Sequence, residues 1–174
     1  PTGVELPLAE IEEIICANQD AVVIVDEAYV DFGAVSARSL IDKYENLLVV
    51  QTFSKSRSLA GLRIGYAFGS RKLINYLNDA KYSFNSYTMN RPSLELGAAV
   101  LREDAYFQET CRKIIATRER TKQELKKLGF VFADSQANFV FAAHPRYPAK
   151  ELFEALREKH IFVRYWNKPQ INNY

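Results

Sequence analysis

The stretch QTFSKSRSLAGLRIGY, residues 51–66, follows directly on the apolar run LLVV at residues 47–50. A short run of this kind is typical of a buried strand in a parallel sheet. Lys55 stands between two serines just past that run, and Arg63 comes eight residues later. Because ligands of open α/β sheets bind outside the carboxyl ends of the strands, this order of residues predicts a binding site rather than more core.

An earlier segment, AVVIVDEAY at residues 21–29, is also a β-branched run, and it ends in acidic residues. Its apolar character on both faces predicts a central parallel strand. A third strand is expected at 62–70, and helical spacing of apolar residues predicts helices at 8–19, 39–46 and 71–80. Strands that alternate with helices indicate an α/β fold with a mostly parallel sheet.

The pattern changes after about residue 84 and predicts a small α+β unit that follows a long helix. Gly129 is the expected end of that long helix, and Pro92 is expected in the first turn of the helix before it. The expected elements are helices at 91–104, 105–129 and 149–160 and strands at 130–134, 137–144 and 161–166. We therefore predict two parts, 1–103 as part of a large ligand-binding domain and 104–174 as a linking helix with a small domain.

Composition excludes several classes of protein. Hydrophobic residues make up 48% and charged residues 25%, which fits a globular protein with a real core. The net charge of +2, with lysines and arginines interleaved with glutamates, gives no reason to expect a nucleic-acid partner. No apolar run approaches the length of about 18 residues that crosses a membrane, and the start of the chain does not resemble a signal peptide.

The two cysteines, Cys16 and Cys111, form neither a metal-binding spacing nor a disulfide framework, so no metal is expected and a cytoplasmic location is predicted. The chain begins at PTGVELP without an initiator methionine and stops at NKPQINNY. Both ends look like cuts through a longer protein, and we expect the chain to be a fragment.

Asp26 and Lys55 define the candidate site. Each is expected at or just past the carboxyl end of a predicted strand, and neighbouring parallel strands would open both side chains into one crevice. A lysine that forms a Schiff base must be neutral part of the time, which partial desolvation favours. A pyridine ring serves as an electron sink only while its nitrogen is protonated, and a fixed carboxylate such as Asp26 holds that proton.

A phosphate group requires a fork of donors. Arg63 offers two parallel N–H groups, with the hydroxyls of Thr52 and Ser54 nearby in sequence. Tyr29, three residues after Asp26, could donate to a ring oxygen of the same ligand. An amine, a carboxylate and a phosphate fork together are the requirements of pyridoxal phosphate.

Structural readings compete with each motif taken alone. The acidic pair in VDEAY could form a turn or cap, Lys55 could be solvated, and Arg63 could pair with a nearby acid. All three motifs in this order at consecutive strand ends favour the cofactor site.

The segments VVIVDEAYVDF, TFSKSRSLAGLRIGY, SQANFVF and IFVRYWNKPQINNY resemble the class I and II aminotransferases of fold type I, and most closely their histidinol-phosphate branch. The resemblance runs over essentially the whole chain in consistent order. It implies a homodimeric, pyridoxal-phosphate-dependent enzyme that exchanges amino groups between amino acids and oxo acids. In that branch the reaction pairs histidinol phosphate with 2-oxoglutarate in histidine biosynthesis.

The same resemblance implies a role for each matching residue. Lys55 would be the Schiff-base lysine, and Asp26, Tyr29, Thr52, Ser54 and Arg63 would bind the cofactor. Arg164 and Asn138 would lie on the substrate side. The family's arginine for the substrate α-carboxylate usually follows NYLR, whereas this chain ends at Tyr174, so the chain alone is expected to be incomplete for activity.

Alternatives remain at this stage. Other fold-type I enzymes, such as an aromatic aminotransferase, a threonine-phosphate decarboxylase or a carbon–sulfur lyase, would carry much the same lysine motif. From another class, VVIVDEA also matches a Walker B strand of an ATPase or helicase, although no phosphate-binding G-x-x-x-x-G-K-[ST] loop occurs in the chain. A third alternative is a non-catalytic interaction domain on an inactive enzyme scaffold.

Overall fold

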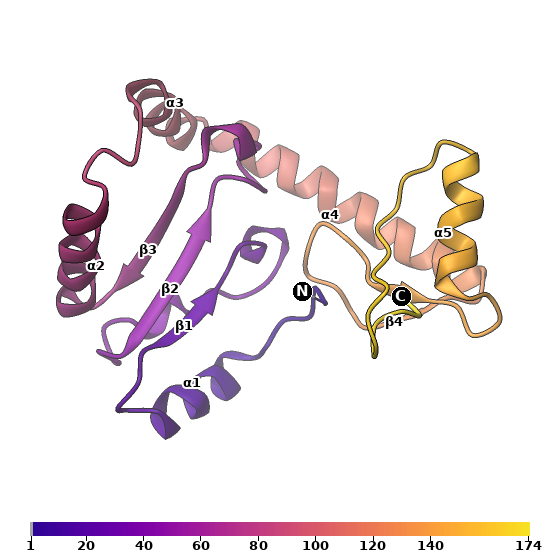
Figure 1. The fold of residues 1–174 in the computed structure, drawn as a ribbon, viewed down its shortest axis with the longest axis horizontal. Coiled ribbons are helices and arrows are strands. Elements are labelled where there is room, and N and C mark those ends of the chain that lie inside the picture. Colours follow the sequence, from indigo (N-terminus) through magenta and orange to yellow (C-terminus); the bar gives the residue numbers. More distant parts are fainter. Residues whose placement is uncertain (1) are drawn as a thin grey trace. The chain divides into compact units, whose positions relative to one another are not determined.

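The computed structural model describes residues 2–174. The chain divides into two compact units, Glu5–Lys113 and Ile114–Tyr174, and the second also takes in the start of the chain up to Val4. The assignment of 1–103 to a cofactor-binding domain stays a prediction. The fold is mixed α/β, as expected, and Figure 1 shows its elements in sequence order.

A three-stranded sheet forms the centre of the unit Glu5–Lys113. Its strands, in the order β1-β2-β3, are β1 (Val23–Asp26), β2 (Leu47–Thr52) and β3 (Gly65–Gly69). Strand β1 runs parallel to β2, and β3 runs antiparallel to β2. Among the described residues the central strand is therefore β2, and the prediction of β1 as central is corrected. Ile24 of β1 keeps 61% of its surface exposed, so the described residues leave the sheet face opposite α1 largely uncovered at this strand.

One face of the sheet packs against helix α1 (Leu8–Ala17). Ile11 and Ile15 of this helix form a buried cluster with Leu47 and Val49 of β2. A one-turn 3-10 helix at Ala37–Leu40 adds Ala37 to the same cluster. The predicted helix at 39–46 is therefore mostly wrong, because only this short turn and irregular turns form there.

Two further helices follow β3, and both begin with a side-chain cap. Ser70 accepts a hydrogen bond from the Leu73 N–H at the start of α2 (Arg71–Phe84), which lies beside β3 in Figure 1. Asn90 does the same for Ser93 at the start of α3 (Arg91–Arg102), whose first turn contains proline. Such caps satisfy N–H groups that have no partner within the helix.

The long helix α4 (Asp104–Lys127) crosses the boundary between the two units. It ends as predicted near Gly129, which has a φ of 88°. The N–H of Phe130 bonds the carbonyl of Leu125 at 3.0 Å, closing the helix end in the manner that a left-handed glycine permits.

The unit Ile114–Tyr174 contains a short antiparallel pair, β4 (Val131–Phe132) and β5 (Ala142–Ala143), and helix α5 (Ala149–Glu158). The strand predicted at 161–166 is wrong, since these residues have no strand pairing and Phe162 is 77% exposed. A strand needs a partner for its backbone N–H and C=O groups, which β propensity alone does not provide.

Two further observations concern the described residues as a whole. No helix in the range 2–174 combines the length and apolarity required to cross a membrane. Within the same range no group of three or more His, Cys, Asp or Glu side chains could hold a metal ion. Both cysteines are free; Cys16 is exposed and Cys111 is buried.

Candidate functional site

The candidate site lies at the carboxyl ends of β1 and β2. Asp26, the last residue of β1, is paired in register with Val50 of the parallel strand β2. The Glu27 N–H extends this ladder with a 2.9 Å bond to the Val50 carbonyl. Lys55 follows three residues after Thr52, the last residue of β2. The two strand ends therefore meet at one edge of the sheet, as the sequence predicted.

Lys55 and Tyr29 lie close together at this edge. The Lys55 Nζ is 5.2 Å from the centre of the Tyr29 ring, within the range of a cation–π contact. Lys55 is exposed, whereas Tyr29 is half-buried. Between the strand end and Tyr29, the Asp26 Oδ1 accepts a 3.0 Å bond from the Ala28 N–H, so Asp26 also shapes the turn. The chain thus carries an amine, a phenol and a carboxylate into one region.

Hydroxyl groups line the start of the lysine loop. The Thr52 Oγ1 lies 3.0 Å from the Ser54 Oγ and accepts a 3.1 Å bond from the Ser54 N–H. It also lies within 3.2 Å of the Ile64 carbonyl, which belongs to the segment that carries Arg63. These bonds bring the segments 52–54 and 63–64 side by side.

Arg63 adopts the left-handed backbone conformation, with φ of 56° and ψ of 43°. Ser58, in the same loop, has a φ of 58°. Such residues cost about 1–2 kcal/mol each unless the surroundings hold them, and they gather at functional sites. The Arg63 Nη1 donates to the Ala60 carbonyl at 3.0 Å. Among residues 2–174 no ion pair joins Arg63 to a carboxylate, so the structural alternative raised for this residue is not observed.

The opposite face of the sheet carries a hydrogen-bond network beneath the site. Side chains alternate along a strand, so Asp26 and Thr52 face one way and Glu27 and Gln51 the other. The Glu27 Oε2 accepts 2.7 Å bonds from the Gln51 Nε2 and the Ser36 hydroxyl. The Gln51 Oε1 in turn accepts a 2.7 Å bond from the Tyr66 hydroxyl on β3. Glu27 is 8% exposed, and these bonds compensate its burial.

Aromatic rings surround Tyr66, the third residue of this network. The Tyr66 ring meets the rings of Phe53 and Phe68 edge to face, each at a centroid distance of 5.4 Å. Burial, with a smaller contribution from the Asp31 carboxylate, raises the pKa of Tyr66 above its usual value. The hydroxyl therefore stays protonated and remains a donor to Gln51.

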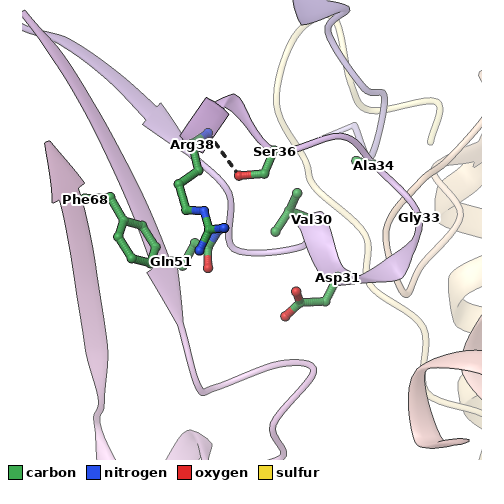
Figure 2. A pocket seen from close by; sticks show the side chains of 8 residues that line it. All are labelled: Val30, Asp31, Gly33, Ala34, Ser36, Arg38, Gln51 and Phe68. Atoms are coloured by element: carbon green, nitrogen blue, oxygen red, sulfur yellow. Dashed lines mark hydrogen bonds between the residues drawn. The ribbon is translucent and has the colours of Figure 1, made fainter. Parts of the chain in front are cut away.

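A cavity of about 430 Å³ opens beside this network (Figure 2). Its lining residues are Val30, Asp31, Gly33, Ala34, Ser36, Arg38, Gln51 and Phe68. Gln51 and Phe68 line it from the sheet face opposite Thr52, and Asp31, which also bonds Ser56 of the lysine loop, lines it from the segment after Tyr29.

Asn138 and Arg164, the predicted substrate-side residues, belong to the unit Ile114–Tyr174. Both are exposed, and the Arg164 guanidinium carbon lies 5.8 Å from the centre of the Trp166 ring. Their part in a shared site stays a prediction, as do the roles assigned to the residues of the lysine loop.

Four residues of this region were not recognised from the sequence: Glu27, Gln51, Asp31 and Ser56. A usable signal existed for Gln51, which follows Leu47 and Val49 at a spacing of two and must therefore face the core. A polar residue at such a position requires buried partners. The partner itself, Glu27, is 24 residues away in the chain and only the fold identifies it.

Known proteins match the chain over its full length. Residues 1–174 match the family described as aminotransferase class I and II. The histidinol-phosphate aminotransferase of Brachyspira hyodysenteriae is 53% identical over 175 residues, which cover 100% of this chain and 49% of that protein. The corresponding protein of Lactococcus lactis subsp. cremoris is 52% identical over 174 residues, with 100% and 49% covered.

A solved structure has the same fold. The histidinol-phosphate aminotransferase of Sinorhizobium meliloti, solved in complex with pyridoxal-5'-phosphate, superposes with a TM-score of 0.86 at 24% identity. The match covers 99% of this chain and 48% of that one. The chain spans about half the length of the curated relatives it matches. On the family match and these identities, the chain belongs to the class I and II aminotransferases of fold type I.

Proposed function

We propose that the protein is a pyridoxal-phosphate-dependent aminotransferase that exchanges an amino group between histidinol phosphate and 2-oxoglutarate in histidine biosynthesis. The observation that carries the proposal is the approach of Lys55 Nζ to the Tyr29 ring, at 5.2 Å, beside the carboxyl ends of two parallel strands. Identities of 52–53% to histidinol-phosphate aminotransferases support the choice of substrate.

The donor set fits the proposed cofactor. Lys55 offers a primary amine for covalent attachment, and Asp26 offers a carboxylate for a protonated ring nitrogen. Tyr29 offers a hydroxyl for the oxygen attached to the pyridine ring. Thr52, Ser54 and Arg63 form a group of donors for the phosphate, and their segments lie side by side through the Thr52–Ile64 bond.

When bound, pyridoxal phosphate supplies an aldehyde and an electron-withdrawing ring. The chain's residues do the rest. Lys55 Nζ would take a proton from the substrate α-carbon and return it to the carbon of the cofactor's former aldehyde group. Asp26 would keep the ring nitrogen protonated, and the phosphate donors would fix the orientation. Asn138 and Arg164 would contact the substrate. A homodimer in the cytoplasm, without nucleic acid or membrane as partner, completes the proposal.

Covalent trapping tests the proposed role of Lys55. The protein is incubated with pyridoxal phosphate, reduced with borohydride and digested, and the modified lysine is identified by peptide mass. We expect the label on Lys55, its loss in Lys55→Ala, and unchanged labelling in Lys72→Ala, which removes an exposed lysine of α2. Label distributed over several lysines would refute the proposal.

Substrate profiling separates the proposed reaction from its relatives. Because this chain alone is expected to be incomplete for activity, the assay uses the full-length protein, in which histidinol phosphate with 2-oxoglutarate should give glutamate with ping-pong kinetics. Release of carbon dioxide from a phosphorylated amino acid, with no glutamate formed, would instead favour the decarboxylase alternative.

A further inference from the structure

The segment with Tyr29 and the loop with Lys55 are joined by one charged hydrogen bond. The Ser56 hydroxyl donates to the Asp31 Oδ2. Ser56 is 4% exposed and Asp31 is exposed, so the hydroxyl end of the bond is shielded from water and the carboxylate end is not. Hydrogen bonds to an ionised carboxylate are roughly twice as strong as neutral ones.

This bond lies next to both candidate site residues. Ser56 directly follows Lys55, and Asp31 is the second residue after Tyr29. Asp31 belongs to the 3-10 turn Val30–Phe32, which Phe32 anchors with a fully buried ring. The carboxylate is thus presented from an element that a buried ring anchors, and its bond links the Tyr29 and Lys55 segments.

Backbone hydrogen bonds and one stacked side chain hold the rest of the lysine loop on both sides of Lys55. The buried residue Phe53 accepts a 2.9 Å backbone bond from the Leu59 N–H, and the Lys55 carbonyl accepts a 3.1 Å bond from Ser58. Arg57 stacks on the Phe107 ring at 3.5 Å. Lys55 itself is exposed between these anchors. Besides the approach of Lys55 Nζ to the Tyr29 ring, the Ser56 bond ties this loop to the Tyr29 segment through the Asp31 carboxylate.

We propose that Asp31 is a positioning residue for Lys55 and acts through the Ser56 hydroxyl. The inference rests on the proposed function, because it concerns how Lys55 is presented to pyridoxal phosphate. Catalytic groups lose rate when their supporting contacts are loosened, since the reactive atom spends less time at the required position. Without the bond, the Lys55 amine could still react with pyridoxal phosphate, but it would no longer be held beside Tyr29.

The test measures covalent attachment rather than turnover. Pyridoxal phosphate is added below saturation, samples are reduced with borohydride over time, and label on Lys55 is quantified by peptide mass. We expect Asp31→Ala and Ser56→Ala each to slow attachment about tenfold, the factor that corresponds to one lost charge-assisted hydrogen bond. The double variant should be no slower than either single one, because both remove the same bond.

Two further variants and one spectroscopic readout complete the design. Asp31→Asn keeps an acceptor for the hydroxyl and should recover most of the rate, and Asp79→Ala, an exposed position of α2, should match the wild type. The visible circular dichroism of the attached cofactor, at saturation and with all variants folded, should weaken in Asp31→Ala and Ser56→Ala. A merely structural role would lower thermal stability and leave this signal unchanged.

The outcomes separate the two hypotheses. If the wild type is not labelled at Lys55, the proposed function fails and the inference fails with it. If the wild type is labelled and the single variants attach cofactor at its rate, the inference alone is refuted. Effects that multiply to about a hundredfold in the double variant would also refute it, because Asp31 and Ser56 would then act independently.

Discussion

Glu27 carries a full set of hydrogen bonds at a buried position. Its carboxylate accepts from the Ala37 N–H at 2.6 Å and from Ser36 and Gln51 at 2.7 Å. Each of these partners donates in the structure, and the two carboxylate oxygens of Glu27 accept all three bonds. The residue beside the candidate Asp26 therefore stabilises the fold, although both residues carry a carboxyl group.

We expect Glu27→Gln to lower the free energy of unfolding by about 1–3 kcal/mol. The introduced amide N–H₂ would face the donors and leave a buried polar group unsatisfied. Urea denaturation measures the effect, and Glu13→Gln on the exposed side of α1 is the matched control. Equal stabilities of the two variants would contradict this role of Glu27.

Lys122 of α4 is a second charged residue at a buried position, with 7% exposure. It forms ion pairs with Asp134 and, at 2.9 Å, with Glu119. Burial disfavours the charge on Lys122, but the hydrogen bonds that Lys122 donates to the two carboxylates outweigh it and raise the pKa of the amine. The same contacts lower the pKa of Asp134 and of Glu119.

The depressed pKa values predict a loss of stability in acid. Carboxyl groups whose pKa is lower in the folded state stabilise the protein above their unfolded pKa, near pH 4, and this contribution disappears as the pH falls through the folded values. Unfolding measured from pH 6 to pH 3 should therefore show a decline that is weaker in Lys122→Met. Lys127→Met, which removes an exposed ion pair of the same helix, should keep the wild-type slope.

At the scale of elements, the backbone conformation of a glycine and the atoms around it decide whether a larger residue can replace it. Gly129 has a φ of 88°, and an added Cβ would lie 3.2 Å from the His144 Nε2. Gly61 has no such φ, and an added Cβ there meets no atom within 4 Å. We expect Gly129→Ala to lower the free energy of unfolding by about 1 kcal/mol or more, and Gly61→Ala to leave it unchanged or raise it slightly. Chemical denaturation of both variants measures the difference, and a neutral Gly129→Ala would contradict the inferred strain.

The helices α1 to α5 were predictable because their apolar spacing lies within single stretches of sequence. Two parallel strands were predicted from apolar runs that each end in polar residues, and the structure shows that these strands, β1 and β2, pair with each other. The predictions for segments 39–46 and 161–166 were wrong for the opposite reason. Their pattern suited a helix and a strand, but what they form depends on packing and partners that local sequence does not specify.

In the candidate site, too, some residues could be recognised from the local sequence, whereas some contacts could not. Asp26, Tyr29, Lys55 and the hydroxyl residues were identifiable because they follow strand ends in the chain. The bonds Glu27–Gln51 and Asp31–Ser56 join residues 24 and 25 positions apart, and only the completed fold brings these partners together.

For the whole molecule, helix α4 is the continuous element shared by the two units. Lys113 is the last residue of one unit, is largely exposed, and pairs with Glu109 at 2.7 Å. Trp166 is the single tryptophan and lies in the other unit, so its fluorescence reports on that unit alone. These features allow a test of how far the helix couples unfolding of the two units.

We expect Lys113→Pro to lower the free energy of unfolding by about 3 kcal/mol, since proline in a helix interior removes a hydrogen bond and clashes with the preceding turn. It should also separate the unfolding transitions followed by Trp166 fluorescence and by far-UV circular dichroism, which we expect to coincide in the wild type. Lys113→Ala loses the same ion pair without breaking the helix and serves as control. Coincident transitions in Lys113→Pro would show that α4 does not couple the units.

The alternation of side chains along β1 and β2 has a consequence for how the gene can change. Residues that stabilise the fold and residues of the candidate site occupy adjacent positions, Glu27 beside Asp26 and Gln51 beside Thr52. Loss or gain of a single codon within either strand would turn the side chains that follow it to the opposite face of the sheet. The residues that stabilise the fold and those of the candidate site would then exchange faces. Substitutions can accumulate here one at a time, whereas in-frame insertions and deletions of one residue should be excluded from both strands and confined to the turns that connect them.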